Sequence, residues 1–204
     1  MKDSETRQAQ GGTRWRRFAA MMVPAAVAAG GIVFGMANGA IAANITVAGK
    51  PFKISASELD GDGFKQYGGV VTTKDGKIVP VAMSEIGEAH LTKLCQSVDA
   101  SVPGLPKIVL TINAGDGGPG KEAVAKNLLI AMESLEGDAE FTNINIGKDA
   151  SDLGPAPAGS FGQDATHVNI KDLEQVARYT TAGTFTLTGL KLKVNVGAEA
   201  KECF

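Results

Sequence analysis

The amino-acid sequence predicts a mainly β protein: a single antiparallel sandwich or roll-like domain over residues 44–204, after an N-terminal export or anchor helix within residues 1–43. Stretches in which apolar and polar side chains alternate predict half-buried strands. Segments rich in glycine and proline predict the loops that connect these strands. A basic segment followed by a long apolar run predicts the N-terminal helix.

The first 43 residues carry the signals of export. Arg14, Arg16 and Arg17 precede an apolar run, Phe18–Ala43, in which Asn38 is the one polar residue. A basic segment before an apolar one is typical of a signal peptide, or of a membrane anchor whose N-terminus stays inside the cell. We therefore expect the protein to be secreted or to lie on the extracellular face of the cell membrane.

The sequence leaves open whether this segment is cleaved. The small residues Ala40-Ile41-Ala42 predict cleavage between Ala42 and Ala43. In contrast, Gly31, Gly35 and Gly39 have the spacing of packed membrane helices, and Phe18–Met36 has a length on the boundary between a signal peptide and a spanning helix. A retained segment would make the membrane a partner of the protein.

The first half of the domain contains one predicted hairpin and one short strand. Ile45–Ile54 predicts an opening hairpin that turns around Gly49-Lys50, and the β-branched run Lys107–Ile112 predicts a strand. Gly115–Gly120 is predicted to be a loop. Lys121–Leu135 fits either an amphipathic helix or a strand, so its structure stays open.

The second half contains the clearest strand, over Thr184–Val196. Its apolar parity changes at Thr188-Gly189, which predicts a β-bulge, and a similar shift occurs within Phe141–Gly147. Lys148–Gly162 is predicted to be a loop, whereas Lys171–Tyr179 fits a helix or a strand equally well.

Two cysteines also indicate a location outside the cytoplasm, as the export segment does. Cys95 and Cys203 are the only cysteines, and an even number in an oxidising space predicts one disulfide between them. Such a bond would hold the C-terminus against the domain. The alternative is one buried thiol and one thiol in the tail. Because the sequence has no C-x-x-C motif, zinc binding and thioredoxin-like chemistry are disfavoured.

Charge and composition exclude a nucleic-acid partner. The chain has 20 basic and 22 acidic residues, and the part after residue 43 has 15 and 20, a net charge of −5. No basic excess is present to neutralise phosphates. Aromatic residues make up only 5% of the chain, too few for platforms on which bases stack.

Three motifs are better explained without a cofactor or a metal. Gly115–Lys121 has the spacing of a phosphate-binding loop, but Glu122 stands where serine or threonine is needed. Asp60–Gly63 resembles the start of a calcium loop, but its later positions lack oxygen ligands, so a solvated turn is expected. His90 and His167 alone predict no metal site. We therefore expect no cofactor and no metal.

One motif suggests a nucleophile. Ala158–Gly162 is a variant of the G-x-S-x-G turn that exposes a catalytic serine, here Ser160. A serine nucleophile needs a base and an acceptor that orients the base. His167 is the nearest candidate base, with Asp164 or Asp172 as its orienting acceptor. The alternative interpretation is an ordinary turn, because no strand–turn–helix context is predicted here.

Short sequences spread over the chain resemble one family of small exported actinomycete proteins, many of them known only as a domain of unknown function. The matching region runs from near Arg14 to Phe204. The residues that carry the resemblance are GFKQYGGV, LCQSV, VPGL, FTNINIG, AGSFGQ, TTAGTFTLTGLKL and the terminal ECF. Some members are described as a distinct type of cholesterol esterase.

The resemblance implies hydrolysis of a sterol ester, or at least its binding, outside the cell. Hydrolysis needs an apolar groove and a group that stabilises an oxyanion. The alternative function is a non-catalytic envelope domain that binds lipid or assembles with copies of itself as a homo-oligomer. Five aliphatic residues could line such a groove, although their alternation with polar residues predicts that they belong to the core. They are Ile144, Ile146, Leu187, Leu190 and Leu192.

Overall fold

The computed structural model describes residues 45–204, and its fold is mainly β, as the sequence predicts. Every strand pairing is antiparallel except that of β1 with β2. The export segment and the cleavage site between Ala42 and Ala43 lie outside the described residues. Residues 45–204 contain no helix long and apolar enough to span a membrane.

Ten strands and two short 3₁₀ turns make up the described part. The elements are β1 (Thr46–Val47), β2 (Phe52–Thr73), β3 (Ile78–Thr92), β4 (Leu94–Asp99), β5 (Ile108–Ala114), β6 (Ala123–Thr142), β7 (Asn145–Asp149), η1 (Ala150–Asp152), β8 (Phe161–Thr181), β9 (Thr184–Thr186), β10 (Lys191–Val196) and η2 (Gly197–Glu199).

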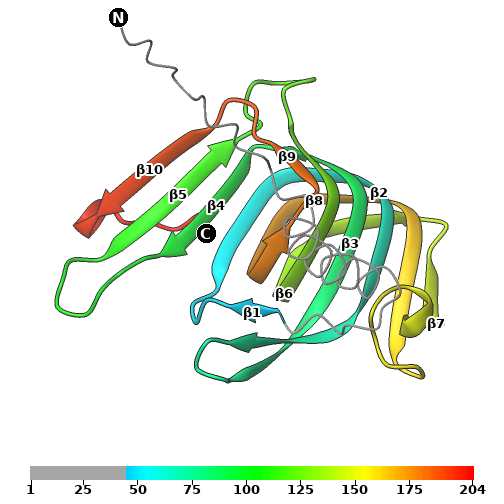
Figure 1. Ribbon diagram of the computed structural model, residues 1–204. Coiled ribbons are helices and arrows are strands. Elements are labelled where there is room, and N and C mark those ends of the chain that lie inside the picture. Colours follow the sequence, from blue (N-terminus) through cyan, green and yellow to red (C-terminus); the bar gives the residue numbers. More distant parts are fainter. Residues whose placement is uncertain (1–44) are drawn as a thin grey trace, which may run out of the picture. The chain divides into compact units, whose positions relative to one another are not determined.

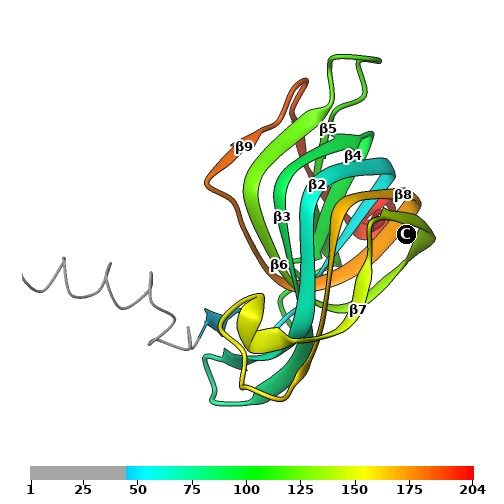
Figure 2. The ribbon, with the colours of Figure 1, turned by 90° about the vertical axis from the view of Figure 1, so that its right-hand side faces the viewer.

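Four long strands close into a small barrel. β2 pairs with β3, β3 with β6, β6 with β8, and β8 returns to pair with β2. In this last pairing, Phe52 lies opposite Ala177 at one end and Tyr67 lies opposite Gly162 at the other, and the circuit is complete. Figures 1 and 2 show these strands curving around a common interior. Because a closed sheet pairs its own edges, these strands are protected from pairing with other chains along the closed part.

Three of the four barrel strands, β2, β6 and β8, contain residues whose backbone has a positive φ. The four strands have 15 to 22 residues, whereas strands usually have about 3–10. At Gly137 the pairing of β6 with β8 shifts its register. A Cβ there would lie 2.8 Å from the carbonyl oxygen of Lys171, so only glycine fits. The residues with positive φ inside the barrel strands are Gly63, Asn127, Gly137 and Asp172.

Alternate residues of β6 pack on opposite faces of the sheet. Leu128, Ile130 and Met132 face the barrel interior, where they join the main core. Leu129 and Ala131 pack in a second, outer core, which residues from β1 and η1 cover. This period of two resolves the ambiguity over Lys121–Leu135 in favour of a strand. Lys171–Tyr179 likewise forms part of β8.

Three shorter strands extend the sheet beyond the barrel, and we call β4, β5 and β10 the wing. β4 pairs with the beginning of β2 at Lys53–Ser55, β5 pairs with β4, and β10 pairs with β5. Figure 1 shows the wing on one side of the barrel, with β10 outermost. The predicted strand at Lys107–Ile112 corresponds to β5.

Three local predictions from the sequence are wrong. The shift within Phe141–Gly147 is not a bulge but the turn between β6 and β7. The strand predicted over Thr184–Val196 is divided: β9 pairs with β6, and β10 pairs with β5. Thr188-Gly189 lies in the turn between them and does not form a bulge. The hairpin predicted around Gly49-Lys50 does not form either, because β1 pairs in parallel with Thr72 and Thr73 at the far end of β2.

The predicted disulfide is confirmed: Cys95 and Cys203 are joined, with their Cα atoms 5.9 Å apart. The backbone N–H of Cys203 donates a hydrogen bond to Ser97 Oγ at 3.0 Å. Lys53 Nζ donates to the carbonyl oxygen of Phe204 at 2.7 Å and lies 5.0 Å from the centre of its ring. The C-terminal segment is therefore fastened to both β2 and β4.

Loss of the disulfide should lower the free energy of unfolding. The bond joins residues 108 positions apart, and chain-entropy models give roughly 4–5 kcal/mol for so long a loop. We expect the double variant Cys95→Ser, Cys203→Ser to unfold at a lower urea concentration than the oxidised protein and at the same concentration as the reduced wild type. Equal midpoints for the oxidised protein and the double variant would contradict a stabilising role.

Candidate functional site

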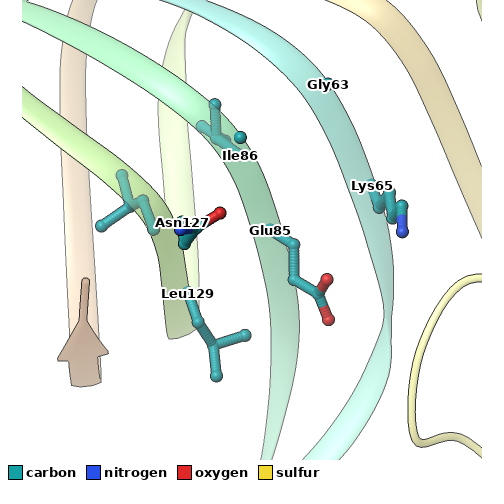
Figure 3. Close-up of a pocket in the computed structure, with 8 residues that line it drawn as sticks. Gly63, Lys65, Glu85, Ile86, Asn127 and Leu129 are labelled. Carbon is teal, nitrogen blue, oxygen red and sulfur yellow. The ribbon is translucent and has the colours of Figure 1, made fainter. Parts of the chain in front are cut away.

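The outer face of the barrel contains two hollows that adjoin each other, and we call them together the outer hollow. One measures about 300 Å³ and the other about 510 Å³, and Glu85 and Leu129 line both. Figure 3 shows the smaller hollow, with Lys65, Glu85 and Leu129 on three neighbouring strands. The strand register agrees, because Glu85 of β3 pairs with Lys65 of β2 and with Leu129 of β6.

The larger part of the outer hollow is mainly apolar. Its wall contains two consecutive glycines, Gly68 and Gly69, which bring no side chain into the space. A Cβ at Gly68 would meet no atom within 4 Å, whereas one at Gly69 would lie 2.6 Å from Met83 Cγ, a side chain that lines the hollow. The apolar side chains around it are Ile45, Val70, Met83, Leu129, Pro155 and Pro157.

Three polar residues, Lys65, Glu85 and Asn127, line the smaller part of the outer hollow, which we therefore call its polar end. Lys65 Nζ donates a long hydrogen bond, 3.4 Å, to the carbonyl oxygen of Leu153. Ammonium and amide groups at the end of an apolar hollow are suited to the carbonyl or carboxylate oxygens of an amphiphile.

A buried tyrosine, Tyr67, lines the larger part and contacts Glu85, which lines both parts. The hydroxyl of Tyr67 donates to Glu85 Oε1 at 2.5 Å. Burial, together with the hydrogen bond to Glu85 and its negative charge, raises the pKa of Tyr67 far above the ordinary value. Tyr67 therefore remains a neutral hydrogen-bond donor at physiological pH and holds the Glu85 carboxylate in one orientation.

Ser160, the predicted nucleophile, lines the apolar part of the outer hollow. It lies in the loop just before β8, and its hydroxyl donates to the carbonyl oxygen of Pro157 at 2.5 Å. No histidine is among the residues that line the outer hollow. The serine proton is thus directed at a backbone carbonyl and not at a base.

His167, the predicted base, lies elsewhere on β8. It is seven residues beyond Ser160 along an extended chain, a separation of roughly 20 Å at about 3.3 Å per residue. Its ring nitrogens meet two carboxylates of β2: Nδ1 lies 2.9 Å from Asp62 Oδ1, and Nε2 lies 3.3 Å from Asp60 Oδ2. The hydrogen bond with Asp62 and the charges of both aspartates raise the pKa of His167 above its ordinary value.

Asp164, the predicted orienting residue, has other partners. Lys148 Nζ donates to its Oδ2 at 2.7 Å and Asn145 Nδ2 to its Oδ1 at 3.0 Å, contacts that lower the pKa of Asp164. Asp172 lies within β8, with φ +50°. The structure therefore places Ser160, His167 and Asp164 in three different settings and does not bring them together.

Asp60–Gly63, expected to be a solvated turn, instead lies within β2. Its two aspartates stand two residues apart and therefore share a face, and strand pairing places Asp62 opposite His167. The turn prediction is wrong because the tendency of Asp-Gly to form turns is weaker than the pairing of this stretch on both of its edges.

A comparison with protein families matches residues 48–204 to a family of unknown function, DUF6230. The chain belongs to this family. No curated protein and no solved structure matches the sequence.

In this DUF6230 protein, the other motifs take part in ordinary loop and surface contacts. Gly115–Lys121 lies in the connection between β5 and β6, where Asp116 accepts a hydrogen bond from Lys191 at 2.6 Å. His90 Nε2 lies 3.2 Å from Glu88. Over residues 45–204, no three His, Cys, Asp or Glu side chains are arranged to hold a metal ion.

Sequence reasoning missed Lys65, Tyr67 and Glu85. Their strand positions can be recognised locally, since Lys65 and Tyr67 stand two residues apart and share a face. The contact of Tyr67 with Glu85 depends on the register of β2 against β3, which no local pattern supplies. The outer hollow itself depends on the loop after η1, which folds back over these strands.

We expect nuclear magnetic resonance titration to place the pKa of His167 above its ordinary value of about 6.5. Protonated His167 then stabilises the folded state. This contribution is fully present below the unfolded pKa and is lost as the pH rises through the folded pKa. Asp62→Asn should lower the pKa of His167, because it removes the carboxylate that is hydrogen-bonded to the ring.

Asp164→Asn is the matched control for this titration and should leave the pKa of His167 unchanged, because the Asp164 side chain is bonded to Lys148 and Asn145. A fall in the pKa of His167 in Asp164→Asn, with none in Asp62→Asn, would instead support the pair predicted from the sequence.

Proposed function

We propose that this DUF6230 protein is an exported lipid-binding protein that holds an amphiphile such as a sterol ester in the outer hollow without hydrolysing it. The observation that carries the proposal is an apolar hollow of about 510 Å³ continuous, through Glu85 and Leu129, with a polar end. Sites for small molecules commonly measure about 300–1,000 Å³ and combine an apolar lining with a few polar groups.

The distribution of polar groups supports an amphiphile over a wholly apolar ligand. Lys65 and Asn127 line the polar end, whereas aliphatic side chains and prolines line the larger part. The Glu85 carboxylate already accepts the Tyr67 hydroxyl. The apolar portion of a ligand would lie against Met83 and Leu129, with its carbonyl or carboxylate oxygens near Lys65.

The Cys95–Cys203 disulfide supports the location that the proposal requires. Disulfides persist in oxidising compartments and are rare in the cytosol. A basic N-terminus followed by an apolar segment points in the same direction. The proposal therefore places the lipid-binding domain outside the cell or on the outer face of its membrane.

The second candidate function is hydrolysis of a sterol ester, which the resemblance to actinomycete cholesterol esterases suggests. One observation favours it: Ser160 lines the same apolar hollow. General-base catalysis needs a base within hydrogen-bond reach of the serine, whereas His167 is bound to Asp60 and Asp62. We therefore prefer binding without hydrolysis.

Filling the hollow should weaken binding. In Gly69→Phe the new ring lies on the same side of β2 as Tyr67, where it would displace the flexible Met83 side chain and occupy the apolar part. We expect affinity for a fluorescent long-chain fatty acid, or for a fluorescent sterol ester, to fall at least about tenfold. Gly49→Phe makes the same change at a position with no atom within 4 Å that does not line the hollow, and should bind as the wild type does. Equal affinities for all three proteins would contradict the proposed site.

Ser160→Ala separates the two candidate functions. We expect the wild type not to release fatty acid from a cholesteryl ester or from a short-chain ester, and the variant to bind the fluorescent lipids with unchanged affinity. Release of fatty acid by the wild type and its loss in Ser160→Ala would establish the hydrolase instead.

A further inference from the structure

The wing ends in a strand whose side chains are exposed on both faces. In β10, Leu192, Val194 and Val196 are 57%, 61% and 52% exposed, although the alternation of the sequence predicts a buried row. The lysines between them point to the opposite face and are also exposed. The prediction that Leu190 and Leu192 belong to the core is therefore wrong, as it is for Ile144 and Ile146, whereas Leu187 packs against the main core.

The aliphatic side chains of β10 are much more exposed than those of the neighbouring strand, β5. Leu192, Val194 and Val196 pair with Ile112, Leu110 and Ile108 of β5, so all six share one apolar face. The β5 residues on this face are half-buried, because a strand on each side, β4 and β10, covers part of their surface. The β10 residues have a neighbour on one side only. Within residues 45–204 no strand lies on the other side of β10, and this leaves them exposed.

The free edge of β10 is unusually regular. β10 pairs with β5 over six residues without a shift of register, and it is the last strand on its side of the sheet. At the other end of the sheet, the pairing of β7 with β8 is interrupted by a shift between Ile146 and Lys148. Irregularities of that kind protect an edge from pairing, and β10 lacks them.

The apolar row and the lysines of β10 together select a register for pairing of β10 with a second copy of itself. A two-fold axis through Val194 places Leu192 opposite Val196 of the second copy and Lys193 opposite Asn195. All three aliphatic residues then continue one apolar row, and no lysine faces a lysine. An axis through Lys193 would instead place like charges opposite each other. Lys191 is already paired with Asp116, at 2.6 Å.

We propose that β10 pairs antiparallel with β10 of a second copy, around a two-fold axis at Val194, to join two wings into one continuous sheet. Such an isologous contact closes on itself and gives a dimer. It satisfies the backbone N–H and C=O groups at the edge of β10, which a lipid surface would leave unpaired. The net charge of −5 on the part of the chain after residue 43 also disfavours an anionic membrane as the occupant.

The dimer is tested on the full chain with its disulfide intact, by sedimentation equilibrium. We expect a mass of twice 21.0 kDa that falls to 21.0 kDa in Val194→Lys, which places two lysines against each other at the axis. The matched control is Ile146→Lys on β7, another exposed aliphatic residue of a terminal strand, which should remain a dimer.

A second measurement tests the register. Directly opposed residues of antiparallel strands have Cα atoms about 4.5–5.5 Å apart, within the range that a disulfide bridges. Mild oxidation of Val194→Cys should therefore give a covalent dimer on a non-reducing gel. Lys193→Cys is the control, because its copy lies diagonally across the pair, about 7–8 Å away, and should cross-link poorly.

Three results would overturn the proposal. One is a wild-type monomer together with no cross-link in Val194→Cys. Another is a dimer that Val194→Lys leaves intact. The third is a monomer that co-sediments with phosphatidylcholine vesicles and loses this binding in Val194→Lys, which would identify the apolar row as a lipid-binding surface. The test does not involve the outer hollow, so its outcome is independent of the lipid-binding proposal.

Discussion

The pairing of β2 with β8 is the constraint on which the rest of the structure depends. β2 is hydrogen-bonded along one edge to β3 and β4, and its other edge pairs with β8 from Phe52 to Tyr67. Without this second pairing the sheet would remain open, and two long edges would be available to other chains. With it, the faces of the sheet become an inside and an outside. The apolar side chains of four strands then form one interior core.

Closure of the barrel also explains why polar groups meet along the pairing of β2 with β8, which we call the seam. Asn169 of β8 donates to Glu58 and Asp60 of β2, and His167 lies against Asp60 and Asp62. These contacts join strands that are far apart in the sequence. Because the imidazole lies between two carboxylates, the seam has a protonation-dependent contact on its outer side. A histidine engaged in this way is held in place structurally and is not available to a serine in the outer hollow.

The outer face and the wing show what closure leaves unprotected. On the outer face, residues from β1 and η1 cover a second core and leave the outer hollow beside it. The wing lies outside the closed circuit, and the disulfide and the C-terminal segment hold one of its faces. Its other face ends at the exposed aliphatic row of β10. Both proposals, lipid binding and self-pairing, therefore concern surfaces that the barrel does not bury.

The sequence by itself determined the class of the fold, the disulfide and two loops, Gly115–Gly120 and most of Lys148–Gly162, because these depend on local alternation, on the count of cysteines and on glycine and proline. It also indicated that Leu192 and Val194 share a face. Whether that face is covered depends on neighbouring strands, and only the tertiary structure decided that it is not.

Dependence on neighbouring strands also explains why the sequence did not predict the contacts of the candidate site residues. Proximity in the sequence suggested Asp164 as the partner of His167, whereas strand register places Asp62, 105 residues away, against its ring. Alternation fixes which side of a strand a residue occupies, but the residue it meets across the strands is set by closure of the barrel, a long-range constraint that no local pattern contains.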